Sequence, residues 1–177
     1  CSTICSPSPR RAGIVTAERG TLTIAKSAGR VDELAALLKR MPVRGSLGVG
    51  HTRWATHGPA TDENAHPHVG GNGVLALVHN GVIENFRPIK ERLLEKGYEF
   101  RSATDSEVVA HLIADELAML PPSFDDSADP YAPLIAAVQA ALVQLRGTYG
   151  LAIVFRDWPD VIVAARLGSP LVIGVGD

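Results

Sequence analysis

The chemically richest part of the sequence is a set of short polar segments near its middle. They are HTRWATHG from His51, NAHPH from Asn64, HNG from His79 and TDSE from Thr104. Each segment follows an expected strand or opens an expected helix, where side chains and free backbone N–H groups converge on a pocket. These segments are therefore the candidate functional site.

An amino acid is a ligand that two of these residues would suit. Arg53 offers a rigid guanidinium fork for a carboxylate, and Asp105, at a helix start, offers a counter-charge for an amine. A salt bridge between Arg53 and Asp105, or with surface charges, explains the same residue types without a ligand. From residue type alone, the salt bridge is the more common arrangement.

The Asn80-Gly81 pair also has two explanations. After a strand such a pair is typical of a turn, which is the favoured explanation for the two residues taken by themselves. In an active site, the Asn amide and the Gly N–H would be two donors aimed at a developing oxyanion.

Most of the histidines cluster in the same part of the sequence: His51, His57, His66 and His68. Their spacings are not the i, i+4 pair of a helical zinc site, and no cysteine or clearly placed carboxylate accompanies them. A metal site is therefore not predicted. Taken alone, Trp54 is more often a core residue than a binding platform, and Cys1 more often an inert thiol than a nucleophile.

The elements that must position these residues are strands and helices in alternation. Apolar periodicity predicts strands at 13–15, 21–25, 47–52, 74–78, 151–155, 161–165 and 171–175, and helices at 31–40, 85–95, 106–120 and 133–145. Thr104 or Asp105 is expected to cap the third helix, and Pro88 fits the first turn of the second. This order predicts a mixed α/β domain in which sheets sandwich or cover helices.

Size and composition indicate one globular domain. The chain has 177 residues, of which 46% are hydrophobic, and a formal charge of −2 without a block of either sign. Because this charge distribution offers no footprint for nucleic acid or an anionic membrane, a small molecule is the expected partner. No apolar run approaches the roughly 20 residues that cross a bilayer, so a cytoplasmic location is expected. Cys1 and Cys5 are expected to be thiols.

Taken together, the polar segments indicate a particular protein family more specifically than any one of them does alone. HTRWATHG, NAHPH, HNGVIENF and TDSEVVAHL, in this order and at these intervals, closely resemble the glutaminase domain of the glucosamine-6-phosphate synthase family. RGTYGLAIV and ARLGSPLVIG resemble its later strands, so the resemblance runs from about residue 12 to the end. It implies an α+β fold, the four-layer αββα sandwich of N-terminal nucleophile hydrolases, and a class II glutamine amidotransferase without a metal or organic cofactor.

The resemblance also implies a role for each residue of the site. Cys1 is the nucleophile and its own α-amino group the base, since an α-amine titrates near neutral pH. Asn80 and Gly81 form the oxyanion hole. Glutamine is held by Arg53 at its carboxylate and Asp105 at its α-amino group, with Thr56, His57 and His66 in the pocket and Trp54 on the loop that closes over it.

The implied reaction is hydrolysis of L-glutamine to glutamate and ammonia through a γ-glutamyl thioester. In the full-length homodimeric enzyme, sugar isomerase domains use the ammonia to make glucosamine 6-phosphate from fructose 6-phosphate. Those domains are absent here, so residues 12–177 are expected to be the glutaminase domain. Two alternatives stay open: a catalytically impaired domain that binds glutamine, and another class II amidotransferase, such as a phosphoribosylamine-forming enzyme.

The N-terminus departs from the family pattern. Residues 1–11 read CSTICSPSPRR, and Ser2 stands where the family motif has Gly. We expect this segment to be atypical or disordered, and the first strand and helix of the family to be absent or replaced. The explanations are an incomplete sequence, a divergent form that still binds glutamine, or a thiol that reaches the site along another path. A missing strand would expose core surface, which favours the first.

Overall fold

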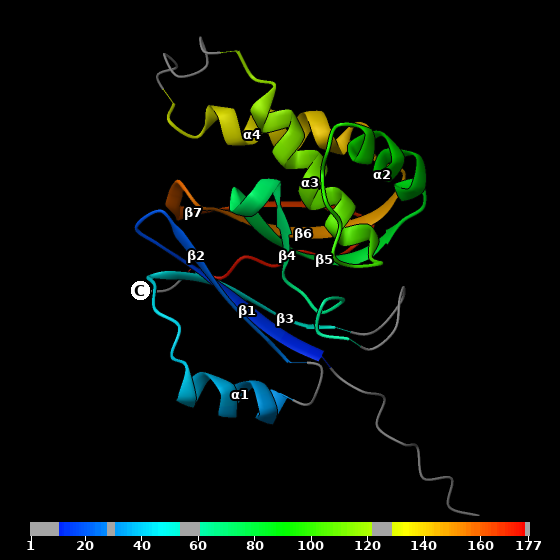
Figure 1. Ribbon diagram of the computed structural model, residues 1–177. Coiled ribbons are helices and arrows are strands. Elements are labelled where there is room, and N and C mark those ends of the chain that lie inside the picture. The colour runs from blue at the N-terminus through cyan, green and yellow to red at the C-terminus, as the bar shows by residue number, and fades with distance from the viewer. Residues whose placement is uncertain (1–10, 28–30, 54–60, 122–128, 176–177) are drawn as a thin grey trace, which may run out of the picture.

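The computed structural model describes residues 11–27, 31–53, 61–121 and 129–175 (Figure 1). Four of the predicted site residues therefore lie outside the described residues: Cys1, Trp54, Thr56 and His57. For Arg53, the backbone is described and the side chain is not.

The first sheet is antiparallel, with the strand order β2-β1-β3. The expected strands at 13–15 and 21–25 lie in β1 (Arg11–Glu18) and β2 (Thr21–Ser27), which form a hairpin, and β3 (Leu47–Arg53) pairs with the other edge of β1. α1 (Val31–Arg40) has acidic residues in its first turn and basic residues in its last, which suits the helix dipole. Its buried Leu34 packs with Ala12 and Ala25, so α1 covers the hairpin as its amphipathic pattern predicts.

The second sheet is also antiparallel, with the order β4-β5-β6-β7. Its strands are β4 (His68–Gly70), β5 (Leu75–Ile83), β6 (Gly147–Phe155) and β7 (Trp158–Leu167), and a short 3-10 turn, η1 (Gly71–Gly73), joins the first two. The expected strands at 151–155 and 161–165 are confirmed within longer ones, and the expected strand at 74–78 overlaps β5 from Leu75 onward. β4 was not predicted, because a strand of three residues has too little periodicity to detect.

Two elements expected from the sequence are absent from the described residues: a strand at 171–175 and a turn at Asn80-Gly81. The apolar run 171–175 has no regular secondary structure, and Val172 is 90% exposed. An apolar β-branched run becomes a strand only where a neighbouring strand completes its hydrogen bonds, and none pairs with this run within the described residues. Asn80 and Gly81 do not form a turn after a strand, because both lie inside β5 and pair with Gly150 and Tyr149 of β6.

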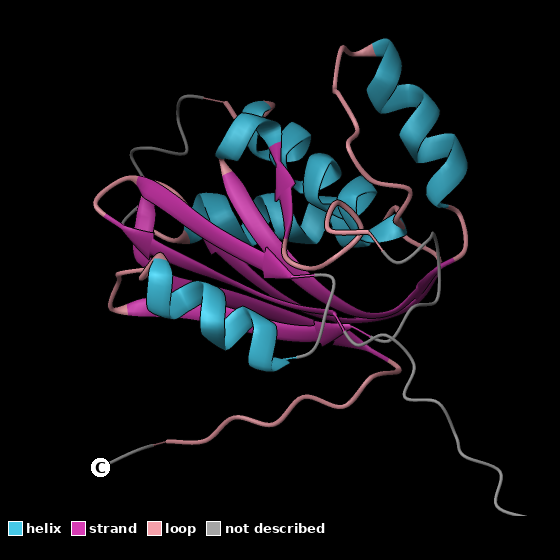
Figure 2. Ribbon diagram, turned by 60° about the horizontal axis from the view of Figure 1, so that its bottom comes forward, coloured by secondary structure: helices cyan, strands magenta, loops and turns pink. Residues whose placement is uncertain are grey.

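The remaining helices are α2 (Phe86–Glu95), α3 (Asp105–Ala118) and α4 (Ala132–Leu142), close to the predicted ranges. They cover the face of the second sheet that points away from the first sheet (Figures 1 and 2). The main core lies there, between α3 and the strands β5 and β6. Every residue of α3 from its start to Asp115 is buried, so α3 is the central helix. Among the described helices, none combines the length and apolarity needed to span a membrane.

The layers are therefore α1, the first sheet, the second sheet, and the three other helices (Figure 1). A small cluster of Val15, Ala76 and Val154 packs the two sheets against each other. This arrangement confirms a mixed α+β fold with two antiparallel sheets.

Candidate active site

The start of α3 is fastened to the end of β5 by Asp105. The carboxylate of Asp105 is buried, and its Oδ2 accepts a 2.8 Å hydrogen bond from the backbone N–H of Ile83. Thr104 caps the helix, as predicted, since its side chain accepts from the backbone N–H of Glu107. A carboxylate in the first turn is also favoured by the helix dipole. These contacts place the negative charge of Asp105 beside the strand that carries Asn80 and Gly81.

The amide of Asn80 is oriented by a residue of the other sheet. Its Oδ1 lies 2.9 Å from Nε2 of His51 in β3. The Asn80 oxygen can only accept, so Nε2 of His51 carries the proton and donates it. Burial lowers the pKa of His51, which keeps this imidazole neutral. Because His51 binds the oxygen, the NH₂ group is the donor side of the Asn80 amide.

Gly81 occupies a backbone position that a side chain cannot share. Its φ is +134°, and a Cβ atom would lie 2.1 Å from the carbonyl oxygen of Thr148. β5 therefore approaches β6 more closely here than other residues allow. The conformation of the strand directly after Asn80 depends on this glycine.

A cluster of neutral histidines fills the space between the sheets at this end. The rings of His51 and His66 are 4.3 Å apart, and those of His66 and His68 are 4.7 Å apart. Burial, reinforced by the neighbouring basic groups, lowers the pKa of His68 to about 3 and depresses that of His66 further. His68 contacts Thr104 through Nε2 and Oγ1, 3.2 Å apart. The described residues contain no group of three or more ligand-type side chains suited to a metal ion.

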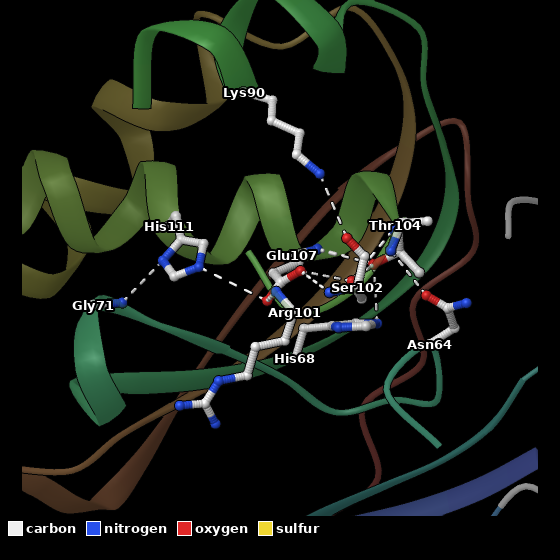
Figure 3. Close-up of polar contacts among 10 residues, drawn as sticks. Asn64, His68, Gly71, Lys90, Arg101, Ser102, Thr104, Glu107 and His111 are labelled. Atoms are coloured by element: carbon white, nitrogen blue, oxygen red, sulfur yellow. Dashed lines mark hydrogen bonds and ion pairs between the residues drawn. The ribbon is translucent and has the colours of Figure 1, made fainter. Parts of the chain in front are cut away.

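Glu107 holds together the loop that enters α3, a role that the sequence analysis missed (Figure 3). Its Oε1 accepts from the N–H of Arg101 at 2.9 Å, and its Oε2 accepts from both the N–H and the hydroxyl of Ser102 at 2.7 Å. Asn64 accepts from the N–H of Ala103 and so ties the NAHPH segment to the same loop. The TDSE segment has the Thr-x-x-Glu pattern of a capping box, but only its Thr104 half forms, because the N–H of Thr104 donates to Oγ of Ser102 and Glu107 accepts from Arg101 and Ser102 instead.

The predicted site residues that are described come together from distant segments. His66 contacts His51, His51 binds Asn80, and Asn80 lies on the strand whose last residue is bound by Asp105. The backbone of Arg53 lies at the end of the same strand as His51.

Two cavities lie elsewhere, on the far side of His68 and along α3. They measure about 710 Å³ and 550 Å³, and both are lined by His111 and Asn72. Of the predicted glutamine-binding residues whose side chains the structure describes, His66 and Asp105, neither lines either cavity. We place the candidate site at Asn80 and Asp105 because His51 orients the amide of Asn80, and the buried carboxylate of Asp105 is bonded to the end of the same strand.

Known proteins of similar sequence carry a related domain. Residues 24–117 match the protein family described as "Glutamine amidotransferase domain". A relative from Zymomonas mobilis subsp. mobilis, named glutamine–fructose-6-phosphate aminotransferase (isomerizing), is 45% identical over 94% of this chain and 25% of its own length. A relative of the same name from Thermococcus kodakarensis is 48% identical over 94% of this chain and 26% of its own length. The chain thus spans about a quarter of the length of these relatives.

A solved structure shares the arrangement of elements. It is the glutamine phosphoribosylpyrophosphate amidotransferase from B. subtilis, complexed with ADP and GMP. The similarity has a TM-score of 0.61 and 30% identity, and it covers 82% of this chain and 29% of that chain.

Proposed function

The chain belongs to the class II glutamine amidotransferase domain family, and we propose that it hydrolyses L-glutamine to glutamate and ammonia. The observation that carries this proposal is the oriented amide of Asn80. His51 holds its oxygen, so its NH₂ group is available to an oxyanion, and Gly81 follows it directly. Preorganised donors of this kind stabilise the tetrahedral intermediate of acyl transfer.

The fold that fits this function is the four-layer αββα sandwich of the N-terminal nucleophile hydrolases. The order of layers supports it, with α1 on the outer face of the first sheet and α2, α3 and α4 on the outer face of the second. Residues 12–177 would then form the glutaminase domain.

The proposed mechanism assigns a role to each residue of the site. The thiol of Cys1 attacks the side-chain amide carbon of glutamine, with the α-amino group of Cys1 as base. Asn80 and Gly81 donate to the oxyanion as ammonia leaves, and water then hydrolyses the thioester. Asp105 attracts the substrate's α-ammonium group, and its burial at the start of α3 supports this role. Arg53 binds the substrate carboxylate.

The glutamine pocket needs a further set of contacts. We assign Thr56, His57 and His66 to its lining and Trp54 to the loop that closes it. Burial keeps the imidazole of His66 neutral, so His66 would contribute a hydrogen bond rather than a charge.

The acceptor of the ammonia is proposed from the relatives. At 45% to 48% identity they are named glutamine–fructose-6-phosphate aminotransferase, whereas the phosphoribosylpyrophosphate amidotransferase is 30% identical. We therefore propose that sugar isomerase domains receive the ammonia and form glucosamine 6-phosphate. An enzyme that forms phosphoribosylamine is the alternative.

Mass spectrometry after labelling with a diazo-ketone analogue of glutamine tests the function. We expect one adduct on Cys1, protection of that adduct by free L-glutamine, and glutamate release by the unlabelled protein. Cys5→Ser should keep both the adduct and the activity, whereas Cys1→Ser should lose both. A protein that binds glutamine but forms no protected adduct would be the impaired, glutamine-binding form.

A further inference from the structure

His79 and Ser106 form a buried pair beside the candidate site, and neither has a role in the proposed mechanism. They lie on β5 and α3 and are 4% and 3% exposed. Nδ1 of His79 lies 3.0 Å from Oγ of Ser106, and Nε2 lies 3.4 Å from the backbone oxygen of Thr148 in β6. His79 directly precedes Asn80, and Ser106 directly follows Asp105, so each is next to a residue of the site.

The surroundings of His79 determine which ring nitrogen carries the proton. Burial lowers the pKa of His79, against the opposing effect of the Asp105 carboxylate, so the ring is neutral. A carbonyl oxygen can only accept, so a proton on Nε2 makes an attractive contact with Thr148, whereas a bare Nε2 would turn a lone pair toward that oxygen. Nε2 therefore carries the proton, and Nδ1 is an acceptor.

Ser106 has one hydroxyl proton and two acceptors near it. Its Oγ lies 3.0 Å from Nδ1 of His79 and 3.5 Å from Oδ1 of Asp105. A hydroxyl group usually donates over about 2.5–3.0 Å, and over a shorter distance to a carboxylate, so the contact with Asp105 is too long to be strong. The hydroxyl proton of Ser106 therefore goes to His79.

This arrangement leaves one oxygen of Asp105 for a ligand. Its Oδ2 accepts from the N–H of Ile83 at 2.8 Å, whereas Ser106 is the only donor that contacts Oδ1 within the described residues. A buried carboxylate oxygen needs a donor, and an ammonium group supplies three. The charge-assisted bond from an ammonium group to Oδ1 is strongest while the hydroxyl proton of Ser106 points elsewhere.

We propose that His79 is a positioning residue for substrate binding, which accepts the proton of Ser106 and so keeps Oδ1 of Asp105 open for the α-ammonium group of glutamine. Without the Nδ1 acceptor, the hydroxyl group would turn to Oδ1 and compete with the substrate. The inference rests on the proposed function. His79 and Ser106 affect glutamine binding only through Asp105.

A double-mutant cycle in the full chain carrying Cys1→Ser, which cannot form the thioester, tests the inference. Isothermal titration calorimetry compares L-glutamine with glutaramate, its analogue without the α-amino group. His79→Leu should weaken L-glutamine binding roughly 10-fold, the effect of one competing hydrogen bond, and leave glutaramate binding unchanged. Ser106→Ala removes the competing donor, so L-glutamine affinity should stay within about twofold of the parent's, with or without His79→Leu.

The cycle separates positioning from a merely structural role. If His79 only supported the packing of β5, His79→Leu would weaken both ligands, and Ser106→Ala would not restore L-glutamine binding. Either result overturns the inference, and so does weaker L-glutamine binding in Ser106→Ala alone. His111→Leu is the control, because it removes a buried histidine that binds Gly71 instead, and it should change neither affinity. Circular dichroism checks that each variant is folded.

Nitrogen NMR of the His79 ring tests the tautomer in the unsubstituted chain, and so decides the question even if His79→Leu does not fold. A proton on Nε2 and none on Nδ1 is expected. A proton on Nδ1 would occupy Oγ of Ser106 and turn the hydroxyl proton toward Asp105. That result would overturn the inference.

The outcomes also separate this inference from the proposed function. If the wild-type protein releases no glutamate but the cycle gives the expected affinities, catalysis fails and the role of His79 stands. If the wild-type protein releases glutamate and His79→Leu binds L-glutamine normally, only the role of His79 fails. If the parent binds neither ligand, both proposals are overturned.

Discussion

Replacing Gly81 with alanine should destabilise the protein more than the same substitution at a glycine with open surroundings. The new Cβ atom would lie 2.1 Å from the oxygen and 2.7 Å from the carbon of the Thr148 carbonyl, and 3.0 Å from the Cα atom of Tyr149. All three are backbone atoms of β6, so no side-chain rotation can relieve the contact. Either β5 moves away from β6 or their hydrogen bonds distort.

Two terms contribute to the expected loss of stability in Gly81→Ala. A non-glycine residue at a φ of +134° carries backbone strain, which costs about 1–3 kcal/mol. Overpacking against fixed atoms adds about 1–3 kcal/mol. For a domain of this size, the sum of about 2–6 kcal/mol corresponds to a decrease in Tm of roughly 5–20 °C.

Gly97→Ala is the matched control for this measurement. Gly97 also has a positive φ, +89°, but a Cβ atom there would meet nothing within 4 Å. Gly97→Ala should therefore lower the free energy of unfolding only through backbone strain, by about 1–2 kcal/mol. Thermal denaturation followed by circular dichroism compares the two variants with the wild type. Equal decreases in Tm would show that the close approach of β5 to β6 carries no energy, and would refute the steric argument.

Three further predictions concern the site and its support. Asn80→Ala should lower kcat for glutamine hydrolysis by about two to three decades while leaving the fold intact, and a nearly unchanged kcat would remove Asn80 from the oxyanion hole. Glu107→Gln should lower the free energy of unfolding, measured by urea titration, by about 2–4 kcal/mol, because the new NH₂ group would face a backbone N–H donor in place of an oxygen acceptor. Glu95→Gln, at an exposed position, is the control and should leave the free energy of unfolding unchanged. The pKa of His68 is lowered to about 3, so between pH 6.5 and 3 the unfolded chain binds a proton that the folded chain does not, and stability must fall as pH falls through this window. His68→Gln should reduce that slope by up to about 1.4 kcal/mol per pH unit, and an unchanged slope would show that His68 titrates normally in the fold.

Local sequence determined most of the elements of this protein. The amphipathic pattern of 31–40, the cap at Thr104 and the apolar run of β5 depend on residues that are neighbours in the chain, so their structure could be predicted without the fold. The polar segments indicated the class of chemistry for the same reason, because their residue types and spacing are properties of the chain itself. The glutamine amidotransferase family that they resemble is confirmed.

The arrangement of the site, in contrast, was decided by contacts between distant segments. Only strand pairing shows that Asn80 and Gly81 lie inside β5 and that His51 orients the amide. The same holds for the neutral state of His66 and His68, which burial imposes on residues of ordinary intrinsic pKa. The run 171–175 has the composition of a strand and remains irregular, because a strand needs a partner that no local pattern can supply. Propensity acts between neighbours in sequence, whereas register, burial and charge pairing are properties of the packed molecule.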